Sequence, residues 1–578
     1  MADTTTRRTA PLQPSNNTTS QGHKPPSPIS ASESDTNLFH SPLPLITFIL
    51  CVCECLKMEN DSKRPFLLPI DYEQQVSNKD EKQPNYLTQL LSNHSFFTSF
   101  VISEDDIPPI TGVHGFLSAF KEESSKLWYL AGPAILTSVF QYTLGAVTQT
   151  FAGHVGTLDL AAFSMENSVI SCLCFGVMMG MGSALETLCG QAVGAGQTNM
   201  LGVYMQRSWV ILLSTSFLLT FMYIFAEPLL LLLGQTEDIS RAAGKFSLWM
   251  IPQLYAYAMN FPIAKFLQAQ SKMIAMAWIS ALTLALHVLF SWLLMLKLRW
   301  GIAGGAVVLN ASWWFLVVAQ LVYIFSGGCG NAWSGFSWMA FQNLWGFVRL
   351  SIASAVMLCL EIWYFTALIL FAGYLKNAEV SVDALSICIN ILGLTCAVAL
   401  GFNAAISVRV SNELGAAHPR AAKFSVAVVV ISSFLMALLF SIVILVFRYQ
   451  YPSLFTESSV VRKVVYELTP LLAFCIVLNN VQPALSGVAI GAGWQSLVAY
   501  MNIACFYLFG IPLGLIFGYA LKMGVRGIWW GMTFGTVVQT LCLFLMVYKT
   551  NWNKEASVAA KRIKQWGGET DDKLDLEK

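Results

Sequence analysis

From Lys126 onward, the chain is a succession of apolar blocks of about 20 to 30 residues, separated by short polar breaks. A helix needs about 20 apolar residues to cross the hydrocarbon core of a bilayer, so each block is long enough for one crossing. Only 12% of the residues are charged, whereas a soluble protein carries roughly 25%. A single span in lipid must satisfy its own backbone hydrogen bonds. The sequence therefore predicts an all-α membrane protein.

The blocks form two sets of six. Spans are predicted near 126–150, 158–190, 204–233, 244–265, 273–297 and 301–326, and then near 346–372, 383–408, 421–447, 462–487, 495–520 and 525–548. We therefore expect a first lobe over 126–326, an inter-lobe loop over 327–345 and a second lobe over 346–548.

The two ends of the chain differ from this core. Residues 1–120 are rich in Ser, Thr, Pro, Asn and charge, a composition that predicts disorder. Met58 opens a second plausible start, so residues 1–57 are interpreted as a dispensable extension. Lys and Arg in residues 549–578 favour a cytoplasmic tail, with the N-terminal region on the same side. Basic residues in loops on the other side disagree, so charge alone does not decide the orientation.

The two halves repeat each other. Gly194 and Gly415, each in a loop-forming motif after the second span of its half, are 221 positions apart, and so are Pro262 and Pro483. The Gly-x-x-Gly openings of the sixth and twelfth spans are 223 positions apart. Because six is even, both halves have the same orientation in the membrane. We expect a pseudo-two-fold axis along the membrane normal and a substrate site between the lobes near the midplane.

Glu361 lies in the middle of the seventh apolar block. An acid at that depth costs ~2.5–3.5 kcal/mol on insertion scales, so it normally faces an internal cavity and binds or carries something. Burial also disfavours the charged form of a carboxyl group. Tyr364 falls on the same helical side and is a candidate aromatic surface for a flat ligand, with packing as the alternative. Glu361 is thus predicted to be a proton acceptor that also switches the conformation.

Other polar residues recur at helical spacing in the second half. They are Asp383 and Asn390 in the eighth block, and Asn479 and Gln482 in the tenth, where Pro483 loosens the helix. Such stripes predict one hydrated cavity. The alternative is that they only join neighbouring helices by hydrogen bonds.

The first half offers a different set of candidates. Gln141 stands where the repeat would place the counterpart of Glu361, and it cannot titrate. Tyr142, next to it, is a second candidate aromatic surface, with packing as the alternative. Glu166, near the start of the second span, is interpreted either as a second titrating site or as a solvated residue at the membrane boundary.

Several function classes are excluded by what the sequence lacks. The net charge of +1 leaves no basic surplus for nucleic acid. The thirteen cysteines have no metal-site spacing, so we expect no metal and no disulfide framework. No Walker-type phosphate loop and no hydrolase or metalloprotease motif occurs. An enzyme and a cofactor are therefore not expected, and a seven-helix receptor has no reason for paired halves.

Besides Gln-Ala-Gln at 268–270, four segments resemble the plant multidrug and toxic compound extrusion (MATE) family. They are Ala-Leu-Glu-Thr-Leu-Cys-Gly-Gln-Ala at 184–192, Met-Leu-Cys-Leu-Glu-Ile-Trp-Tyr at 357–364, Arg-Val-Ser-Asn-Glu-Leu-Gly-Ala at 409–416, and residues 485–495. The resemblance covers about residues 126–564. Residues 480–487 look most like the subgroup with vacuolar flavonoid and proanthocyanidin-precursor transporters.

The resemblance implies a twelve-helix, two-lobe fold that exchanges protons for organic solutes by rocker-switch alternating access. It also implies an acid pair in the second lobe. One acid falls on Glu361, and the other position holds Asn479. Prokaryotic relatives often have an Asp where this chain has Thr148. Both departures place the titration on Glu361.

Together these points predict a monomeric, proton-coupled antiporter in the lipid bilayer. Its expected solutes are flavonoid glycosides or other secondary metabolites and xenobiotics, moved out of the cytosol. The expected location is the vacuolar membrane, with the plasma membrane as the alternative. Rival interpretations are a vacuolar halide conductance and a transporter of a hormone, an alkaloid or an organic acid.

Overall fold

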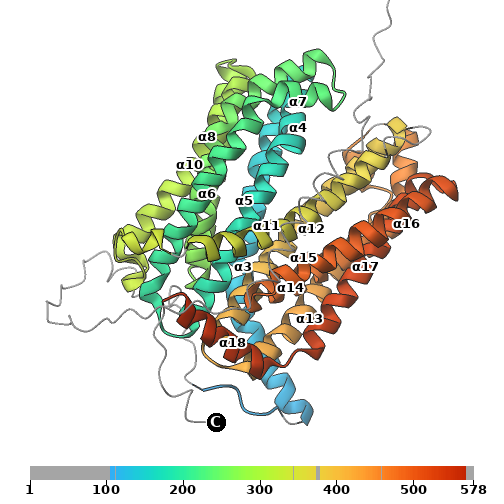
Figure 1. The fold of residues 1–578 in the computed structure, drawn as a ribbon. Helices are drawn as coiled ribbons and strands as arrows, with labels where there is room; N and C mark the ends of the chain where they lie inside the picture. The colour runs from blue at the N-terminus through green and yellow to red at the C-terminus, as the bar shows by residue number, and fades with distance from the viewer. Residues whose placement is uncertain (1–104, 111, 343, 373–377, 457, 568–578) are drawn as a thin grey trace, which may run out of the picture. The chain divides into compact units, whose positions relative to one another are not determined.

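The computed structural model describes residues 105–110, 112–342, 344–372, 378–456 and 458–567. The region 1–120, predicted to be disordered, and the end of the charged tail therefore lie largely outside the described residues. Within the described ranges the secondary structure is helical, with no strand (Figure 1). Eleven helices there are long and apolar enough to cross a membrane.

The first half contains six long antiparallel helical segments. In order they are α3 (Gly112–Val155), α4 (Thr157–Met165) continued by η1 (Glu166–Ser171) and α5 (Cys172–Gly194), α6 (Leu201–Ile224) with the short α7 (Ala226–Leu232), α8 (Glu237–Ala269), α9 (Met273–Ser291) with η3 (Trp292–Lys297), and α10 (Gly301–Tyr323) with η4 (Ile324–Gly328). The single turns η2 (Thr198–Met200), η5 (Gly330–Ala332) and η6 (Trp338–Phe341) lie in connections.

The second half repeats this order. It consists of α11 (Leu344–Ala372), α12 (Ala378–Gly415), α13 (Pro419–Val446), η7 (Tyr451–Leu454), α14 (Ser459–Ala492), the continuous segment α15 (Gln495–Asn502), η8 (Ile503–Gly510), α16 (Ile511–Leu515) and η9 (Ile516–Ala520), and α17 (Gly524–Lys549). A final helix, α18 (Trp552–Gln565), follows the last span.

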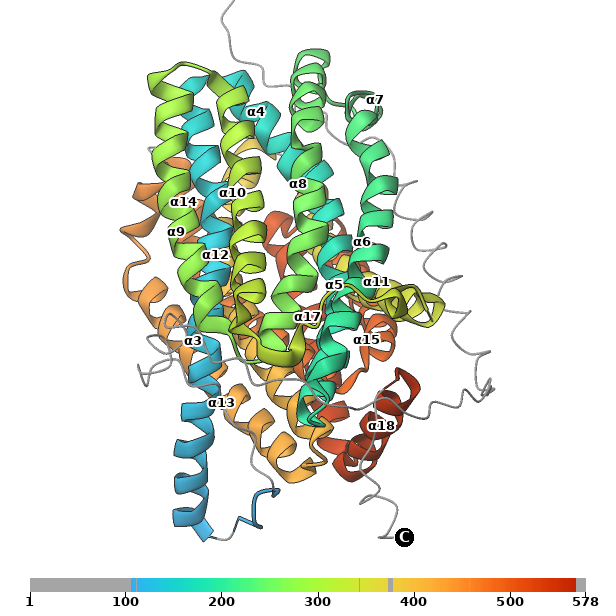
Figure 2. The same cartoon turned by 90° about the vertical axis from the view of Figure 1, so that its left-hand side faces the viewer.

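The helix α8 completes the first set of six. It does not meet the hydropathy criterion that the eleven others meet, because it carries buried polar residues such as Gln253 and Asn260. It is nevertheless 33 residues long and packs against α5, α6 and α10. Figure 2 shows α8 running alongside α10 and α6. The predicted architecture of twelve helices in two sets of six is confirmed.

The duplication is visible in the backbone itself. Left-handed residues follow corresponding helices of the two halves, at Gly196 (φ 75°) and Ala417 (φ 60°), and again at Arg299 (φ 56°) and Lys522 (φ 55°). A non-glycine residue in this region costs roughly 1–2 kcal/mol. The same left-handed turn at corresponding positions, adopted by a non-glycine residue at three of the four, therefore indicates two copies of one architecture.

The first helix begins earlier than predicted. α3 starts at Gly112, inside the segment interpreted as disordered. The reason is Glu123, whose buried carboxylate accepts two hydrogen bonds of 3.0 Å from the Arg409 guanidinium of α12 and one of 2.5 Å from Ser425 of α13. A buried ion pair needs such additional hydrogen bonds to offset desolvation. The polar stretch of α3 at 121–126 is thus anchored to the second half.

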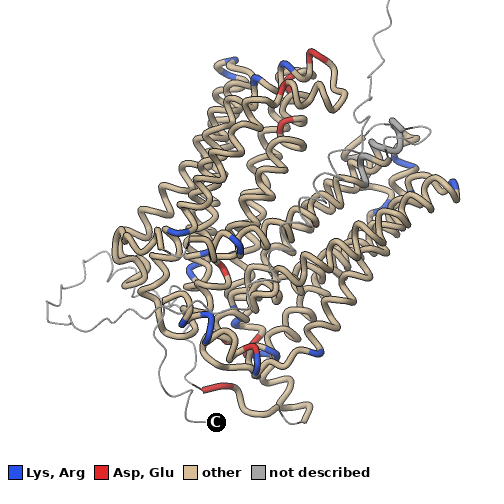
Figure 3. Tube along the Cα trace, viewed as in Figure 1, with Lys and Arg blue, Asp and Glu red and all other residues tan. Residues whose placement is uncertain are grey.

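Charged residues lie mostly toward the helix ends, and the long middle stretches are largely uncharged (Figure 3). The hydrophobic core divides into two main clusters. One is built from second-half helices together with Leu127, Leu130, Ala131 and Ala134 of α3. The other is built mostly from α4 to α10. This division matches the two predicted lobes, with α3 contributing to both.

Candidate functional site

The two lobes meet tightly at the end where α5 and α12 terminate. A side chain added at Gly194 would run into the backbone of Asn412, and one added at Gly415 would run into the backbone of Gln191. Gln191 and Asn412 are themselves repeat counterparts, 221 positions apart. Such reciprocal contacts are the mark of a two-fold interface. We call this set of contacts the closed end.

Hydrogen bonds across the lobes reinforce the closed end. The Thr187 hydroxyl donates to the Ile490 carbonyl at 2.5 Å, and the Gln191 amide donates to the Gly491 carbonyl at 3.2 Å. Arg562 of α18 donates to the Gln191 side-chain oxygen at 3.0 Å and to the Ala492 carbonyl at 3.3 Å. The C-terminal helix therefore ties the first lobe to the second.

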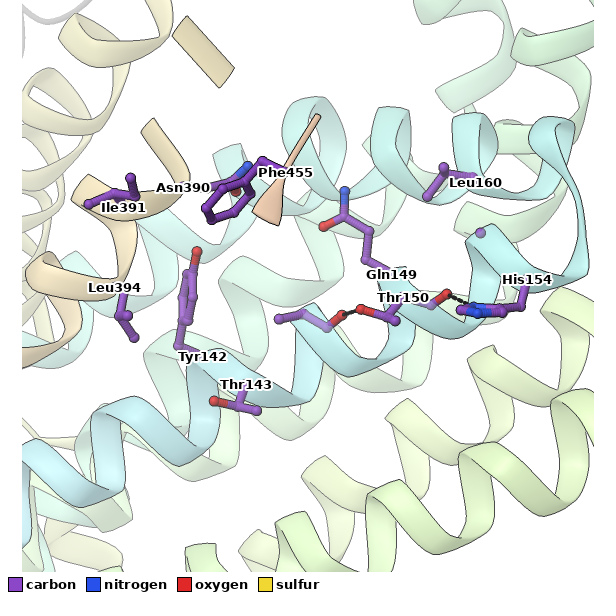
Figure 4. Close-up of a pocket in the computed structure, with 12 residues that line it drawn as sticks. Tyr142, Thr143, Gln149, Thr150, His154, Leu160, Asn390, Ile391, Leu394 and Phe455 are labelled. Carbon is purple, nitrogen blue, oxygen red and sulfur yellow. Dashed lines mark hydrogen bonds between the residues drawn. The ribbon is translucent and has the colours of Figure 1, made fainter. Parts of the chain in front are cut away.

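A pocket of about 660 Å³ lies between α3 and α12, toward the helix ends far from the closed end. Tyr142, Asn390 and Phe455 group at one side of it, and Gln149 and His154 line the other (Figure 4). The Tyr142 hydroxyl approaches α12 at Gly393, where a side chain would come within 2.8 Å of it. Tyr142 and Asn390, both predicted from the sequence, thus meet in one pocket.

Glu361 lies in α11 and is half-buried. Its helix packs against α5 of the first lobe, where a side chain at Gly176 would lie 3.2 Å from Ile362. Cys396 of α12 interacts electrostatically with both Glu361 and Tyr142, although Glu361 is not among the residues that line the pocket. No ion pair in the described ranges involves Glu361.

Gln482 of α14 is an amide side chain that interacts with the Glu361 carboxyl group. Gln482 is buried and also donates to the Ser486 hydroxyl at 3.1 Å. Asn479 lies one turn earlier and is half-buried. Pro483 is buried, and its carbonyl accepts a hydrogen bond of 2.7 Å from Asn403. An amide, which cannot titrate, is therefore the immediate partner of the acid.

Three other candidates are placed less favourably for a role in the cavity. Tyr364 is a correction: it is fully buried in the second lobe, where its hydroxyl donates to the Met532 carbonyl at 2.7 Å and its ring stacks on Phe506. Gln141 is half-buried in α3 and is not among the residues that line the pocket. Asp383 belongs to α12, and its side chain is not among those that the structure describes.

Thr148 is buried inside the first lobe and does not line the pocket. It forms a 3.1 Å hydrogen bond with His287, which in turn forms one of 2.8 Å with Ser312. Both ring nitrogens of His287 are therefore satisfied. The sequence analysis did not identify this network.

Two acids of the first lobe have contrasting surroundings. Glu186 pairs with Lys265 at 2.7 Å near the closed end, as a structural residue would. Glu166 is 2% exposed, so it is not the solvated boundary residue that one interpretation allowed. It begins the π-helical turn η1 between α4 and α5.

A known protein family matches this chain twice, once in each lobe. A family model described as MatE matches residues 133–293 and again residues 353–516, one match in each lobe. The chain belongs to the MatE family. It is therefore a multi-pass integral membrane transporter of small molecules, and not an enzyme.

Plant MATE proteins are similar over most of the chain. Protein DETOXIFICATION 31 of Arabidopsis thaliana is 62% identical over 513 residues, which cover 89% of this chain and 98% of that protein. Protein DETOXIFICATION 29 of the same plant is 66% identical over 468 residues, covering 81% and 94%. The crystal structure of the eukaryotic MATE transporter AtDTX14 is 35% identical, with a TM-score of 0.74, over 77% of this chain and 99% of that one.

Some site residues of this MATE protein escaped the sequence analysis. Gln149 and Phe455 line the pocket, but each stands outside the polar stripes that were counted. His154 is exposed and also lines the pocket. The Nδ1 atom of His154 lies 2.8 Å from the carbonyl oxygen of Thr150, four residues earlier in the same helix. This local contact orients the ring.

Proposed function

We propose that this MATE protein is a proton-coupled antiporter that moves flavonoid glycosides or related secondary metabolites from the cytosol into the vacuole. Glu361 is the proton acceptor in this proposal. A proton from the acidic lumen neutralises Glu361, the packing of α11 changes, and the bound solute is released on that side.

The observation that carries the proposal is the position of Glu361. Its carboxyl group is half-buried and has no ion-pair partner in the described ranges. It lies on α11, which packs against α5 of the first lobe as well as against helices of the second. Neutralising such an acid removes the cost of keeping a charge there. Gln482 can hydrogen-bond to either protonation state because an amide both donates and accepts. Glu361 is thus able to bind and release a proton without losing its partner.

Alternating access is supported by the closed end. The basic residues of α18 favour the cytoplasm, and α18 lies at the closed end, through Arg562. In this orientation the protein is closed toward the cytosol, and the pocket between α3 and α12 lies toward the lumen. Opening the closed end would give the solute access from the cytosol.

The pocket suits a flat ligand with polar substituents. Its volume of about 660 Å³ lies within the range of roughly 300–1,000 Å³ typical of small-molecule sites. Tyr142 and Phe455 offer aromatic surfaces, while Gln149 and Asn390 offer amides that both donate and accept hydrogen bonds. A glycosylated flavonoid presents both an aromatic face and hydroxyl groups.

The test uses proteoliposomes with an acidic interior and a flavonol glucoside outside. Two pH units support roughly a hundredfold accumulation of a neutral solute at one-to-one exchange, because each unit is worth about 1.4 kcal/mol per proton. We expect Glu361→Gln to abolish this accumulation, while Glu237→Gln, at the exposed start of α8, leaves it unchanged. Undiminished accumulation in Glu361→Gln contradicts the proposal. Large chloride currents without a pH gradient would instead favour an anion conductance.

A further inference from the structure

Glu166 is a buried acid that the proposed mechanism does not use. It is 2% exposed, and its oxygen Oε1 is wholly buried without a hydrogen-bond partner in the described part of the chain. Glu166 also takes part in none of the ion pairs found there. Burying a carboxylate without a cation is costly unless the group becomes neutral. An acid in this setting therefore favours its protonated form.

The groups around Glu166 are weak acids and hydrogen-bonding residues. The titratable groups that interact electrostatically with it are Cys174 of α5, Tyr223 of α6 and Tyr257 of α8. The titratable residue of α4 itself, Asp159, lies at the exposed start of that helix. None of these residues carries a positive charge, so no cation in this cluster holds Glu166 in its charged form.

Two hydroxyl groups are available to the acid. The Tyr223 hydroxyl is buried and, like Glu166 Oε1, has no hydrogen-bond partner in the described ranges. The Tyr257 hydroxyl accepts a hydrogen bond of 2.7 Å from Gln253 and so retains its own proton to donate. Ser171, at the other end of η1, lies next to both phenols. A carboxyl group among these residues can exchange partners as it gains or loses a proton.

The local backbone is suited to a moving part. Glu166 begins η1, a π-helical turn within one long segment from Thr157 to Gly194. Single π-helical turns occur frequently at functional sites. At 1.5 Å per residue, Glu166 lies about 14 Å from the start of α4 at Thr157, and Glu361 lies about 17 Å from the end of α11 at Ala372. Because successive helices alternate in direction, the start of α4 and the end of α11 lie on the same side of the membrane, and both distances are measured from that side.

We propose that Glu166, Tyr223 and Tyr257 form a second proton-binding site, in the first lobe, and that two protons are exchanged in each transport cycle. The site is closed to solvent in this conformation and holds its proton. Opening of the closed end rearranges the segment from α4 to α5, exposes Glu166 to water and releases the proton. This inference rests on the proposed proton coupling through Glu361.

The proton stoichiometry tests the inference. With the membrane potential clamped at zero, accumulation of the flavonol glucoside rises about tenfold per pH unit for each proton exchanged. We expect about a hundredfold per unit for the wild type, about tenfold for Glu166→Gln and no accumulation for Glu361→Gln. If accumulation in the wild type rises only tenfold per pH unit, the second site alone is overturned. The same holds if accumulation rises a hundredfold per unit in both the wild type and Glu166→Gln. Accumulation that persists in Glu361→Gln overturns the proposed function instead.

A second variant keeps the test informative if Glu166→Gln does not fold. Tyr223→Phe removes the unpartnered hydroxyl and keeps the ring and the carboxyl. We expect it to shift the pH at which uptake is half-maximal. The matched control is Tyr255→Phe, on the same helix as Tyr257. The hydroxyl of Tyr255 lies 3.3 Å from that of Thr220. Equal pH profiles for Tyr223→Phe, Tyr255→Phe and the wild type would overturn the inference.

Discussion

Replacing Gly194 by alanine should open the closed end. A Cβ atom at Gly194 would lie 2.8 Å from the carbonyl carbon of Asn412 and 2.9 Å from the backbone nitrogen of Ala416, whereas ordinary contacts begin near 3.4 Å. The opposing atoms belong to the backbone and cannot rotate away. The lobes must therefore separate locally by at least about 0.6 Å. Overpacking of this kind typically costs about 1–3 kcal/mol.

That cost falls on the conformation that is closed at this end, because the contact disappears when the lobes separate. A difference of about 1–3 kcal/mol changes the ratio of two conformations by roughly 5- to 150-fold. Cys189 is fully buried at the closed end and reports on this ratio. In a chain whose other cysteines are replaced, we expect a water-soluble maleimide to label Cys189 faster in Gly194→Ala by about this factor.

Two comparisons make the measurement decisive. Gly132→Ala adds the same methyl group to α3, where no atom lies within 4 Å, and should leave the labelling rate unchanged. Gly415→Ala creates the reciprocal overlap with Gln191, so the double variant with Gly194→Ala should cost less than the sum of the two single variants. If Gly194→Ala labels at the rate of Gly132→Ala, the closed end does not restrain the lobes.

The remaining predictions concern paired charges. Arg409→Met leaves two acids of its buried cluster without their cation, so a loss of about 3–5 kcal/mol is expected, measured as a large fall in the melting temperature of the purified protein. Arg420→Met, at an exposed pair, should change stability by less than about 1 kcal/mol. Arg562→Ala removes the hydrogen bonds of its guanidinium to Gln191 and to the Ala492 carbonyl and should speed the labelling of Cys189. The exposed Lys561→Ala should not, and equal rates for the two would exclude α18 as a tie between the lobes.

Hydropathy was sufficient to predict the long helices, because a span in lipid must be apolar and must satisfy its own backbone. It failed to predict the start of α3. The polar stretch 121–126 separates its first turns from the apolar block, and Glu123 in that stretch pairs with Arg409 nearly three hundred positions later. A contact at that separation leaves no periodic signal in the local sequence.

Helical spacing likewise shows which residues share a face but not what that face contacts. Glu361 and Tyr364 were assigned to one side of their helix. In the structure, however, the Tyr364 hydroxyl donates a hydrogen bond to the Met532 carbonyl inside the second lobe, whereas Glu361 interacts electrostatically with Cys396 of α12. The burial of Glu166 could not be predicted for a related reason. Distance from a span boundary does not reveal that Tyr223 and Tyr257 of other helices cover it.

Pairing separates the structural charges of this transporter from those that can respond to protons. At the closed end Glu186 pairs with Lys265, and Glu123 pairs with Arg409. Glu361 and Glu166 form no ion pair in the described ranges. An acid without a basic partner is not held in its charged form by a neighbouring cation. These two acids are therefore the ones on which we expect proton coupling to depend.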